Sequence, residues 1–321
     1  FASYENAITA IGKSAGDAGP YAGDGISVKL SALHPRYVRS QAARVMNELL
    51  PRLVTLAALA QSYNIGLNID DEEADRLELS LDLLESLCFD ESLKNWNGLG
   101  FVVQAYGKRC PFVLDFIIDL ARRSGHRMMV RLVKGAYWDA EIKRAQVDGL
   151  DGFPVYTRKI YTDISYIACA RKLLSMTDRI YPQFATHNAH TVAAILAMAA
   201  DRTSFEFQRL HGMGEQLHEA VRKAEGTRTR IYAPVGAHSD LLAYLVRRLL
   251  ENGANSSFVH QLTDEDVPPE TISRDPFDVV ATQGPAANPA IPKPASIFGA
   301  SRTNARGWDI TDPVTVEKIG S

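Results

Sequence analysis

Cysteine and long apolar runs are both scarce in this sequence. Only three of its 321 residues are cysteines (Cys88, Cys110 and Cys169), and their spacing matches no metal-ligand motif, so we predict no metal site. Cys88 and Cys169 fall in apolar helical stretches, as small core residues do, which favours a reducing cytoplasm. No run of roughly 18 apolar residues occurs, so no spanning helix is predicted and any membrane association would be peripheral.

A surplus of positive charge is absent as well. Lys and Arg number 35 against 38 Asp and Glu, for a net charge of −3, and no basic run stands out. We therefore expect no nucleic-acid binding through this chain. A signal peptide is also lacking, and the abrupt start at Phe1 predicts that the chain is a piece of a longer protein.

Strand and helix patterns alternate from Gly25 onward. Long helical patterns, such as the one opened by Pro35 and running to Leu59, separate the strands. Alternation at this spacing predicts a parallel sheet. The predicted strands cover residues 26–33, 65–70, 99–106, 128–133, 181–187, 205–212 and 230–236.

The fourth predicted strand opens the stretch RMMVRLVKGAYWDAEIKRAQ, residues 127–146. Both of its faces carry apolar side chains, so we expect both to be covered. Gly135 ends the strand, and the helix after it begins acidic and ends basic. Arg131 and Lys134 thus lie near the carboxyl end of a strand, where α/β folds place their chemistry. For Arg131 alone, a structural ion pair is an equally good interpretation.

Polar residues also lie at the ends of several other predicted strands. No GxGxxG turn follows any of these strands. Chemistry spread over many strand ends is typical of a barrel rather than of an open sheet. The sequence therefore predicts a (β/α)8 TIM-like barrel whose first strand lies upstream of this fragment. The strand-closing residues are Lys29, Asp70, Gln104, Arg131, His187, Gln208 and Tyr232.

We predict two parts in the chain, a barrel over residues 1–262 and an arm over residues 263–321. The arm is rich in proline and turn residues without a sustained period, which indicates an extended linker. Residues 148–159 form a Gly- and Pro-punctuated excursion that suggests a functional loop.

The helical pattern over residues 239–253 carries two adjacent arginines on a largely apolar helix. Arg247 and Arg248 can each pair with Glu251, so a surface salt bridge is one interpretation. The other is that the two guanidiniums bind a ligand carboxylate or phosphate.

Seven motifs in chain order resemble the proline dehydrogenase domain of bifunctional bacterial proline utilisation flavoenzymes. The resemblance covers roughly residues 1–262, and the tail resembles those proteins' connection to a downstream aldehyde dehydrogenase module. The motifs are SVKLSALHPRY, NIDDEEADRLELSLDLLE, RLVKGAYWDAEIKRAQ, YPQFATHNAH, FEFQRLHGMGE, RIYAPVG and LLAYLVRRLLENGANSSF.

The resemblance implies an FAD-dependent enzyme of the first step of proline catabolism to glutamate. It would oxidise L-proline to Δ1-pyrroline-5-carboxylate and pass electrons to a membrane quinone, with peripheral association with the inner membrane. The family has a strand before Phe1 that carries an acidic residue near the site, and this chain lacks that strand.

The resemblance also assigns the substrate site. Lys29, Arg247 and Arg248 correspond to the family's grip on the proline carboxylate, which suits the geometry of the arginine fork. Asp70 corresponds to the acidic residue that balances these cations. The pocket lining would come from Tyr137, Leu210, Tyr232 and Tyr244.

For the flavin, Arg131 corresponds to the arginine near the isoalloxazine N5 and Gln104 to a neighbouring hydrogen-bonding residue. A fixed cation there would stabilise the negative charge that reduction places on the ring. The other residues matching the family's cofactor contacts are Val133, Gly135, Ala136, Trp138, Tyr156, Thr157, Arg158, Lys159, Thr186, His187, Asn188, Gln208, Glu251, Ser257 and Phe258.

The implied reaction is direct hydride transfer from C5 of proline to the flavin, with Lys29, Asp70 and Arg131 as the residues that carry it and no general base assigned. Two other functions remain open. One is a Schiff-base aldolase with Lys29 or Lys134 as the nucleophile. The other is a barrel that serves as a dimerisation or docking module without catalysis.

Overall fold

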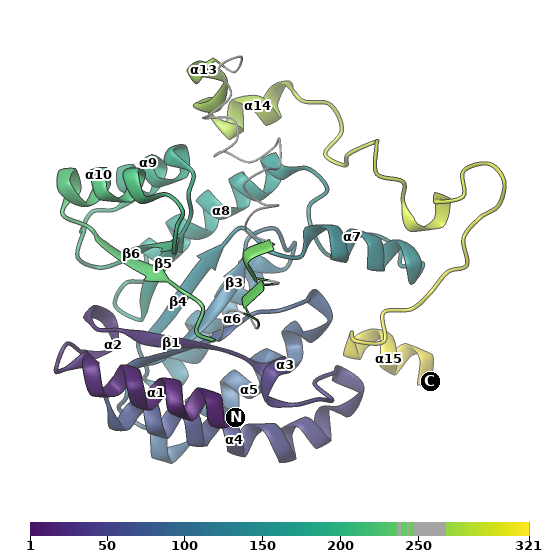
Figure 1. Cartoon of the computed structure of the whole chain (residues 1–321). Helices are drawn as coiled ribbons and strands as arrows, with labels where there is room; N and C mark the ends of the chain where they lie inside the picture. The colour runs from purple at the N-terminus through teal and green to yellow at the C-terminus, as the bar shows by residue number, and fades with distance from the viewer. Residues whose placement is uncertain (237–238, 240, 243, 247–267, 321) are drawn as a thin grey trace.

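In the part of the chain that the structure describes, seven parallel strands form one sheet, in the order of the sequence (Figure 1). The computed structural model describes residues 1–236, 239, 241–242, 244–246 and 268–320. Each strand pairs in parallel with the next, which confirms the predicted parallel sheet. The strands are β1 (Gly25–Lys29), β2 (Gly66–Asp70), β3 (Leu99–Gln104), β4 (Met128–Val133), β5 (Ile180–Ala185), β6 (Glu206–Leu210) and β7 (Arg228–Tyr232).

The sheet curls so that its last strand approaches its first two. Arg230 on β7 donates a hydrogen bond from Nη2 to the carbonyl oxygen of Tyr21, just before β1, at 3.0 Å. Tyr232, at the end of β7, reaches Asp70 at the end of β2. Since β1 and β7 are the two ends of the strand order, such contacts require a curved sheet. The fold is therefore a partial TIM-like barrel, as predicted for the fold class.

Helices pack against the outside of the curved sheet and bury its strands. All residues of β2 and β3 are buried, and so are all but the last of β4. Helix α4 turns Leu49, Leu53 and Leu56 toward the sheet, and each is fully buried. The helices between residues 1 and 225 are α1 (Ala2–Ala15), α2 (Gly19–Ala22), α3 (Leu30–Leu33), α4 (Ala42–Ser62), α5 (Leu77–Cys88), α6 (Cys110–Ser124), α7 (Trp138–Val147), α8 (Lys159–Leu174), α9 (Ala189–Met198) and α10 (Glu215–Glu225).

The sequence-based boundaries are wrong at the start of the chain. The first strand ends at Lys29 rather than at residue 33, because Leu30 and Leu33, three residues apart, are both buried in the helical turn α3. The long helix begins at Ala42 rather than at Pro35, because His34 and Val38 keep extended backbone angles. Helix α1 was not predicted at all.

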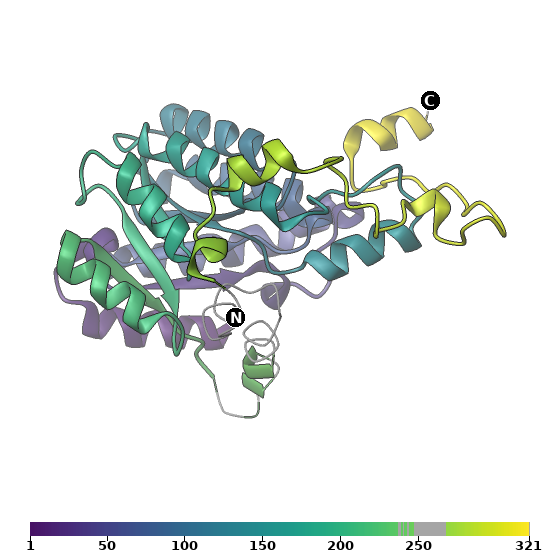
Figure 2. The same cartoon turned by 90° about the horizontal axis from the view of Figure 1, so that it is seen from above.

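The arm after residue 267 contains α13 (Pro269–Ile272), α14 (Pro276–Thr282), a short 3-10 helix (Pro294–Ser296) and α15 (Pro313–Gly320). Both views show it leaving α14 beside α8 and passing the end of α7 (Figure 1, Figure 2). Asn304 donates from Nδ2 to the carbonyl oxygen of Gln146 on α7 at 3.1 Å. This part of the arm is therefore hydrogen-bonded to the barrel.

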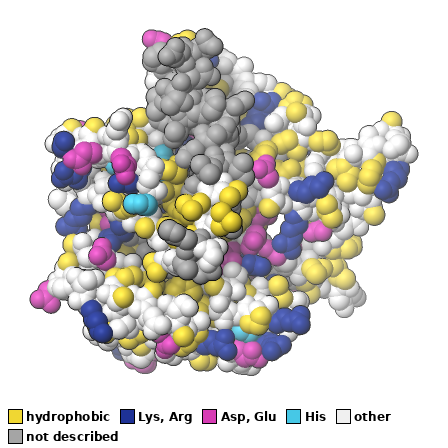
Figure 3. Space-filling view, in the orientation of Figure 1, with side chains coloured by type: hydrophobic (Ala, Val, Ile, Leu, Met, Phe, Trp, Pro, Cys, Tyr) yellow, Lys and Arg dark blue, Asp and Glu magenta, His cyan; other side chains and the backbone are white. Residues whose placement is uncertain are grey.

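Basic and acidic side chains are interspersed on the face seen in Figure 3, with apolar side chains near its centre. This mixture agrees with the nearly balanced charge of the sequence. Within the described residues, no helix combines the length and the apolar character needed to cross a bilayer.

Candidate active site

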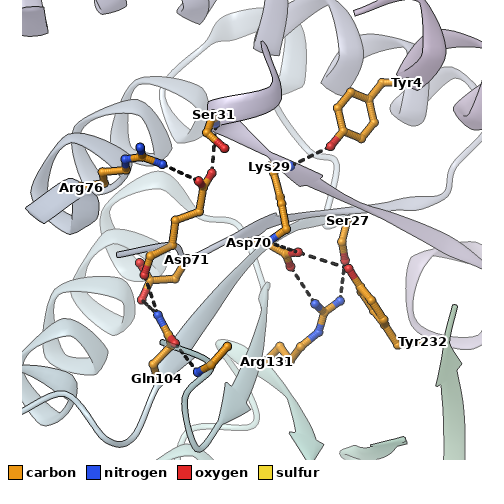
Figure 4. Close-up of polar contacts among 12 residues, drawn as sticks. Tyr4, Ser27, Lys29, Ser31, Asp70, Asp71, Arg76, Gln104, Arg131 and Tyr232 are labelled. Atoms are coloured by element: carbon orange, nitrogen blue, oxygen red, sulfur yellow. Dashed lines mark hydrogen bonds and ion pairs between the residues drawn. The ribbon is translucent and has the colours of Figure 1, made fainter. Parts of the chain in front are cut away.

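The Asp70 carboxylate is the centre of a polar cluster inside the curved sheet (Figure 4). Its Oδ1 accepts a hydrogen bond from Arg131 Nη1 at 2.9 Å. Its Oδ2 accepts one from the Tyr232 hydroxyl at 3.3 Å and lies 3.5 Å from Lys29 Nζ. These four side chains come from the carboxyl ends of β1, β2 and β7 and from the middle of β4, so the curl of the sheet brings them together.

Arg131 is held from three sides. Besides Asp70, its Nη2 donates to Ser27 Oγ at 2.6 Å, and its guanidinium carbon lies 5.0 Å from the centre of the Tyr232 ring. Arg131 is only 7% exposed, and its Nε has no hydrogen-bond partner among the described residues. A buried, rigidly held guanidinium whose Nε–H is unused can bind a hydrogen-bond acceptor without reorganising.

Lys29 keeps its charge in this cluster. Burial alone would lower the pKa of Lys29, but the Asp70 carboxylate and the weaker influence of Tyr137, Tyr232 and Glu72 outweigh it, so the pKa is raised above its ordinary value. The Lys29 side chain is nevertheless 42% exposed. It is therefore an accessible cation, as binding of an anion requires.

The remaining predicted substrate residues differ in how closely they approach the cluster. Tyr137, just before α7, interacts electrostatically with Lys29, and burial raises its pKa. Leu210 ends β6 and is partly buried. Tyr244 is partly buried as well. Arg247 and Arg248 lie outside the described residues, as do the predicted cofactor residues Glu251, Ser257 and Phe258 and most of the predicted helix over residues 239–253.

Gln104 joins three strand ends beside this cluster. Its Nε2 donates to Asp71 Oδ2 at 3.1 Å and to the carbonyl oxygen of Glu72 at 2.8 Å, both just after β2. Its Oε1 accepts from the backbone N–H of Ala136 at 3.2 Å. Gly135 next to it has φ +146°, and a Cβ there would lie 2.3 Å from the Tyr106 ring, so only glycine fits the turn after β4. Val133, also predicted to line the cofactor, ends β4 and is partly buried.

The excursion over residues 148–159, whose last residue Lys159 begins α8, packs against the start of α7. Trp138 Nε1 donates to the carbonyl oxygen of Tyr156 at 2.7 Å. Thr157 Oγ1 accepts from the Asn288 N–H at 3.0 Å, and Arg158 Nε donates to the Ala287 carbonyl at 3.4 Å. The arm thus contacts two of the predicted cofactor residues directly.

Lys134 and Lys159 share one carboxylate. Asp163 on α8 accepts from Lys134 through Oδ1 and from Lys159 through Oδ2, the latter at 3.0 Å. Burial lowers the pKa of Lys134, although the Asp163 charge opposes the shift. The predicted cofactor residue Lys159 is therefore tied to a buried ion pair beside the turn after β4.

The predicted residues after β5 already have partners within the chain. Asn188 caps α9 by accepting from the Thr191 N–H at 3.0 Å, and its own N–H donates to Thr186 Oγ1 at 3.1 Å. His187 Nε2 accepts from the Leu210 N–H at 3.0 Å. Gln208 Nε2 donates to Glu206 Oε1 at 2.7 Å. These bonds fix the positions of the side chains at the ends of β5 and β6.

Sequence reasoning missed several members of the site. Ser27 holds Arg131, the Tyr4 hydroxyl accepts from the Lys29 N–H at 3.0 Å, and Asp71 and Asp163 bind predicted site residues. Ser27 had a usable signal, since it shares the polar face of β1 with Lys29. No cluster of three metal-ligating side chains occurs among the residues that the structure describes.

Residues 1–261 match the family model for proline dehydrogenase. The chain is 61% identical over 327 residues to the bifunctional protein PutA of Rhizobium meliloti, and this match covers 99% of this chain and 26% of that protein. It is 57% identical over 333 residues to bifunctional PutA of Escherichia coli strain K12, covering 99% and 25% respectively. The chain thus spans about a quarter of the length of these curated relatives.

Solved structures show the same relationship. The crystal structure of a mutant of Bradyrhizobium japonicum proline utilization A (PutA) superposes with a TM-score of 0.95 at 53% sequence identity. The match covers 98% of this chain and 33% of that one. The fold of nearly the whole chain is therefore shared with part of a longer protein.

Proposed function

Because this chain belongs to the proline dehydrogenase family, a flavin-dependent family, we propose that it binds FAD and oxidises L-proline to Δ1-pyrroline-5-carboxylate. The observation that carries the proposal is the ion-pair cluster of Asp70, Arg131 and Lys29, in which the Arg131 guanidinium faces the Tyr232 ring. A cationic site with a built-in counter-charge and an aromatic wall suits a small amino acid with one carboxylate.

Lys29 and Asp70 would act on the substrate. The exposed ammonium of Lys29 would bind the proline carboxylate, together with Arg247 and Arg248 as the resemblance implies. Asp70 would keep Lys29 and Arg131 charge-balanced before substrate binds, which limits the cost of burying two cations. Tyr137, Leu210, Tyr232 and Tyr244 would enclose the apolar ring.

The residues present fit a flavin. Arg131 offers a buried Nε donor that no described residue uses, and the Gln104 Oε1 atom has one lone pair beyond its bond to Ala136. FAD would supply the acceptor for the hydride that leaves C5 of proline. Arg131 would stabilise the negative charge that this transfer creates, because its guanidinium is already fixed by Asp70 and Ser27.

The excursion and the strand ends would hold the rest of the cofactor. The other residues proposed as cofactor contacts are Val133, Gly135, Ala136, Trp138, Tyr156, Thr157, Arg158, Lys159, Thr186, His187, Asn188, Gln208, Glu251, Ser257 and Phe258.

A product analysis tests the proposed reaction. The purified chain is incubated with FAD, L-proline and an artificial two-electron acceptor, and the product is identified by mass spectrometry. We expect a product that has lost two hydrogens relative to proline, formed only when FAD is present. Formation of no such product by FAD-loaded protein would reject the proposal.

The aldolase interpretation requires a neutral lysine, which Lys29 does not provide, since its pKa is raised. Lys134 has a lowered pKa but forms an ion pair with Asp163. Borohydride treatment in the presence of carbonyl substrates should therefore label neither lysine. Failure to bind any flavin or amino acid would instead favour the docking interpretation.

We also propose that the chain works as one part of a bifunctional enzyme. The name of the PutA relatives, bifunctional protein, and the fraction of their length that it spans support this arrangement. Residues 1–262 would form the catalytic barrel, and residues 263–321 would lead toward a downstream aldehyde dehydrogenase module. A membrane quinone would accept the electrons, through peripheral association with the inner membrane.

A further inference from the structure

Two adjacent aspartates at the end of β2 point to opposite sides: Asp70 is the last residue of the strand, and Asp71 follows it. Asp70 enters the cluster with Arg131 and Lys29, whereas Asp71 turns away from it toward Gln104 (Figure 4). This divergence follows from the alternation of side chains along an extended chain. The proposed reaction does not use Asp71. The residue as a whole is only partly buried, but its Oδ1 atom is inaccessible to solvent.

The Gln104 amide has one possible orientation among its partners. Its Nε2 atom donates one hydrogen to the Glu72 carbonyl oxygen and the other to the Asp71 carboxyl oxygen Oδ2. The backbone N–H of Ala136 donates to Oε1. A reversed amide would place its oxygen against two acceptors and its NH2 group against a donor, so all three bonds would be lost together.

Asp71 is the only one of these three partners that contributes a side chain. The Glu72 oxygen and the Ala136 N–H belong to the backbone, and they follow the turns after β2 and β4 whatever the side chains are. An aspartate can accept from Gln104 through one carboxyl oxygen whether or not it is protonated. The orientation of Gln104 therefore depends, among side chains, on Asp71.

We propose that Asp71 is a positioning residue that makes Gln104 a hydrogen-bond acceptor only, so that the cofactor group bound there must be a hydrogen-bond donor. Both hydrogens of the Gln104 amide are used, and only a lone pair on Oε1 remains for a ligand. The imide N–H of the oxidised isoalloxazine ring is a donor of this chemical class. The inference rests on the proposed function, because it takes FAD as the ligand.

The test compares Asp71→Leu, Gln104→Leu and the double variant for FAD affinity and for the visible spectrum of bound flavin. We expect Asp71→Leu to raise the Kd for FAD at least about tenfold and to shift the flavin bands, since one Nε2 hydrogen then lacks an acceptor and no side chain holds the amide as an acceptor only. In the Gln104→Leu background, Asp71→Leu should have no further effect, because Asp71 acts through Gln104.

Two further variants separate positioning from general structural damage. Asp71→Asn keeps an acceptor oxygen and should restore FAD affinity to within about threefold of the original chain. Asp75 is four residues from Asp71, in a short 3-10 helix (Ala74–Arg76), and pairs with Arg144 at 2.7 Å, so Asp75→Leu should leave the spectrum unchanged. Circular dichroism establishes that each variant is folded.

The outcomes distinguish this inference from the proposed function. FAD binding by the original chain with an unaltered Kd in Asp71→Leu would overturn the inference alone, and so would additive effects in the double variant. No FAD binding by the original chain would reject the proposed function. In that case the original chain, Asp71→Leu, Gln104→Leu and the double variant are compared by denaturant unfolding. If the two substitutions then change the free energy of unfolding additively, the Asp71–Gln104 link is overturned as well.

Discussion

Arg131 and Asp70 form a buried ion pair, with 2.9 Å between Nη1 and Oδ1, and the same carboxylate binds Tyr232 and Lys29 through its other oxygen. Asp70 is thus the one carboxylate in direct contact with both cations of the described cluster. Loss of this group would leave Arg131 buried without its counter-charge.

Asp70→Ala should therefore lower the free energy of unfolding by about 3–5 kcal/mol, the usual cost of removing one partner of a buried pair. Denaturant unfolding followed by circular dichroism measures it. Asp82→Ala is the control, since Asp82 pairs with Arg39 at the surface and its loss should cost no more than about 1 kcal/mol. Equal decreases in the free energy of unfolding for the two variants would show that the Asp70 pair does not behave as a buried ion pair.

Lys29→Met should raise KM for L-proline at least about tenfold while FAD stays bound, because it removes a charge-assisted bond to the substrate carboxylate. Steady-state kinetics with a flavin spectrum as the loading control measures both. Lys94→Met, at an exposed pair with Glu91, should change neither. Since the pKa of Lys29 is raised, KM should also show no titration of Lys29 between about pH 6 and 9. An unchanged KM in Lys29→Met would remove Lys29 from the substrate site.

Gly149→Ala should detach the arm from the excursion. A Cβ at Gly149 would lie 2.1 Å from the Ala305 carbonyl oxygen, and the Gly149 carbonyl accepts from the Gly307 N–H at 2.9 Å. Limited proteolysis should then cut the arm faster. Gly299→Ala is a matched control, because Gly299 has φ +59° against +64° at Gly149 but nothing within 4 Å of its Cβ position. Equal cleavage of the two variants would show that backbone strain alone, and not arm docking, is responsible.

Asp71→Asn should change the pH dependence of stability. Burial raises the pKa of Asp71 to about 7, against partial opposition from Gln104 and Arg109, whereas the unfolded chain titrates near 3.8. As pH rises from 4 to 7 the unfolded state loses a proton that the folded state keeps, so this group makes the folded chain progressively less stable.

Asparagine does not titrate, so the free energy of unfolding of Asp71→Asn should improve relative to the original chain between these limits, by up to ~4 kcal/mol. Urea unfolding at several pH values measures the difference. The other groups around the carboxyl are Glu72, Tyr106, Arg109 and Cys110, and the variant keeps them all. A difference that is constant with pH would contradict the raised pKa.

The strand ends could be predicted from the sequence because strand periodicity and polar closing residues are local signals. Lys29, Asp70 and Tyr232 end their strands as predicted, whereas Arg131 lies within β4, and the curled sheet brings all four together. Their roles as substrate and cofactor residues came from the family resemblance and stay predictions.

The choice of partners could not be predicted. Asp70 and Asp71 are identical neighbours in the sequence, and only the three-dimensional fold decides that one meets Arg131 and the other Gln104. The ion pair of Lys134 with Asp163 joins residues 29 positions apart for the same reason. Helix α1 was missed because Ile8 is its one buried residue and its partners, such as α4, are distant in sequence.

A visible absorption spectrum of the purified chain with FAD, recorded before and after anaerobic addition of L-proline, tests the central claim most directly. We predict a two-banded spectrum of bound flavin that bleaches when proline is added, since hydride transfer reduces the ring. A bound-flavin spectrum that proline leaves unchanged, or no bound flavin at all, would contradict the proposed function.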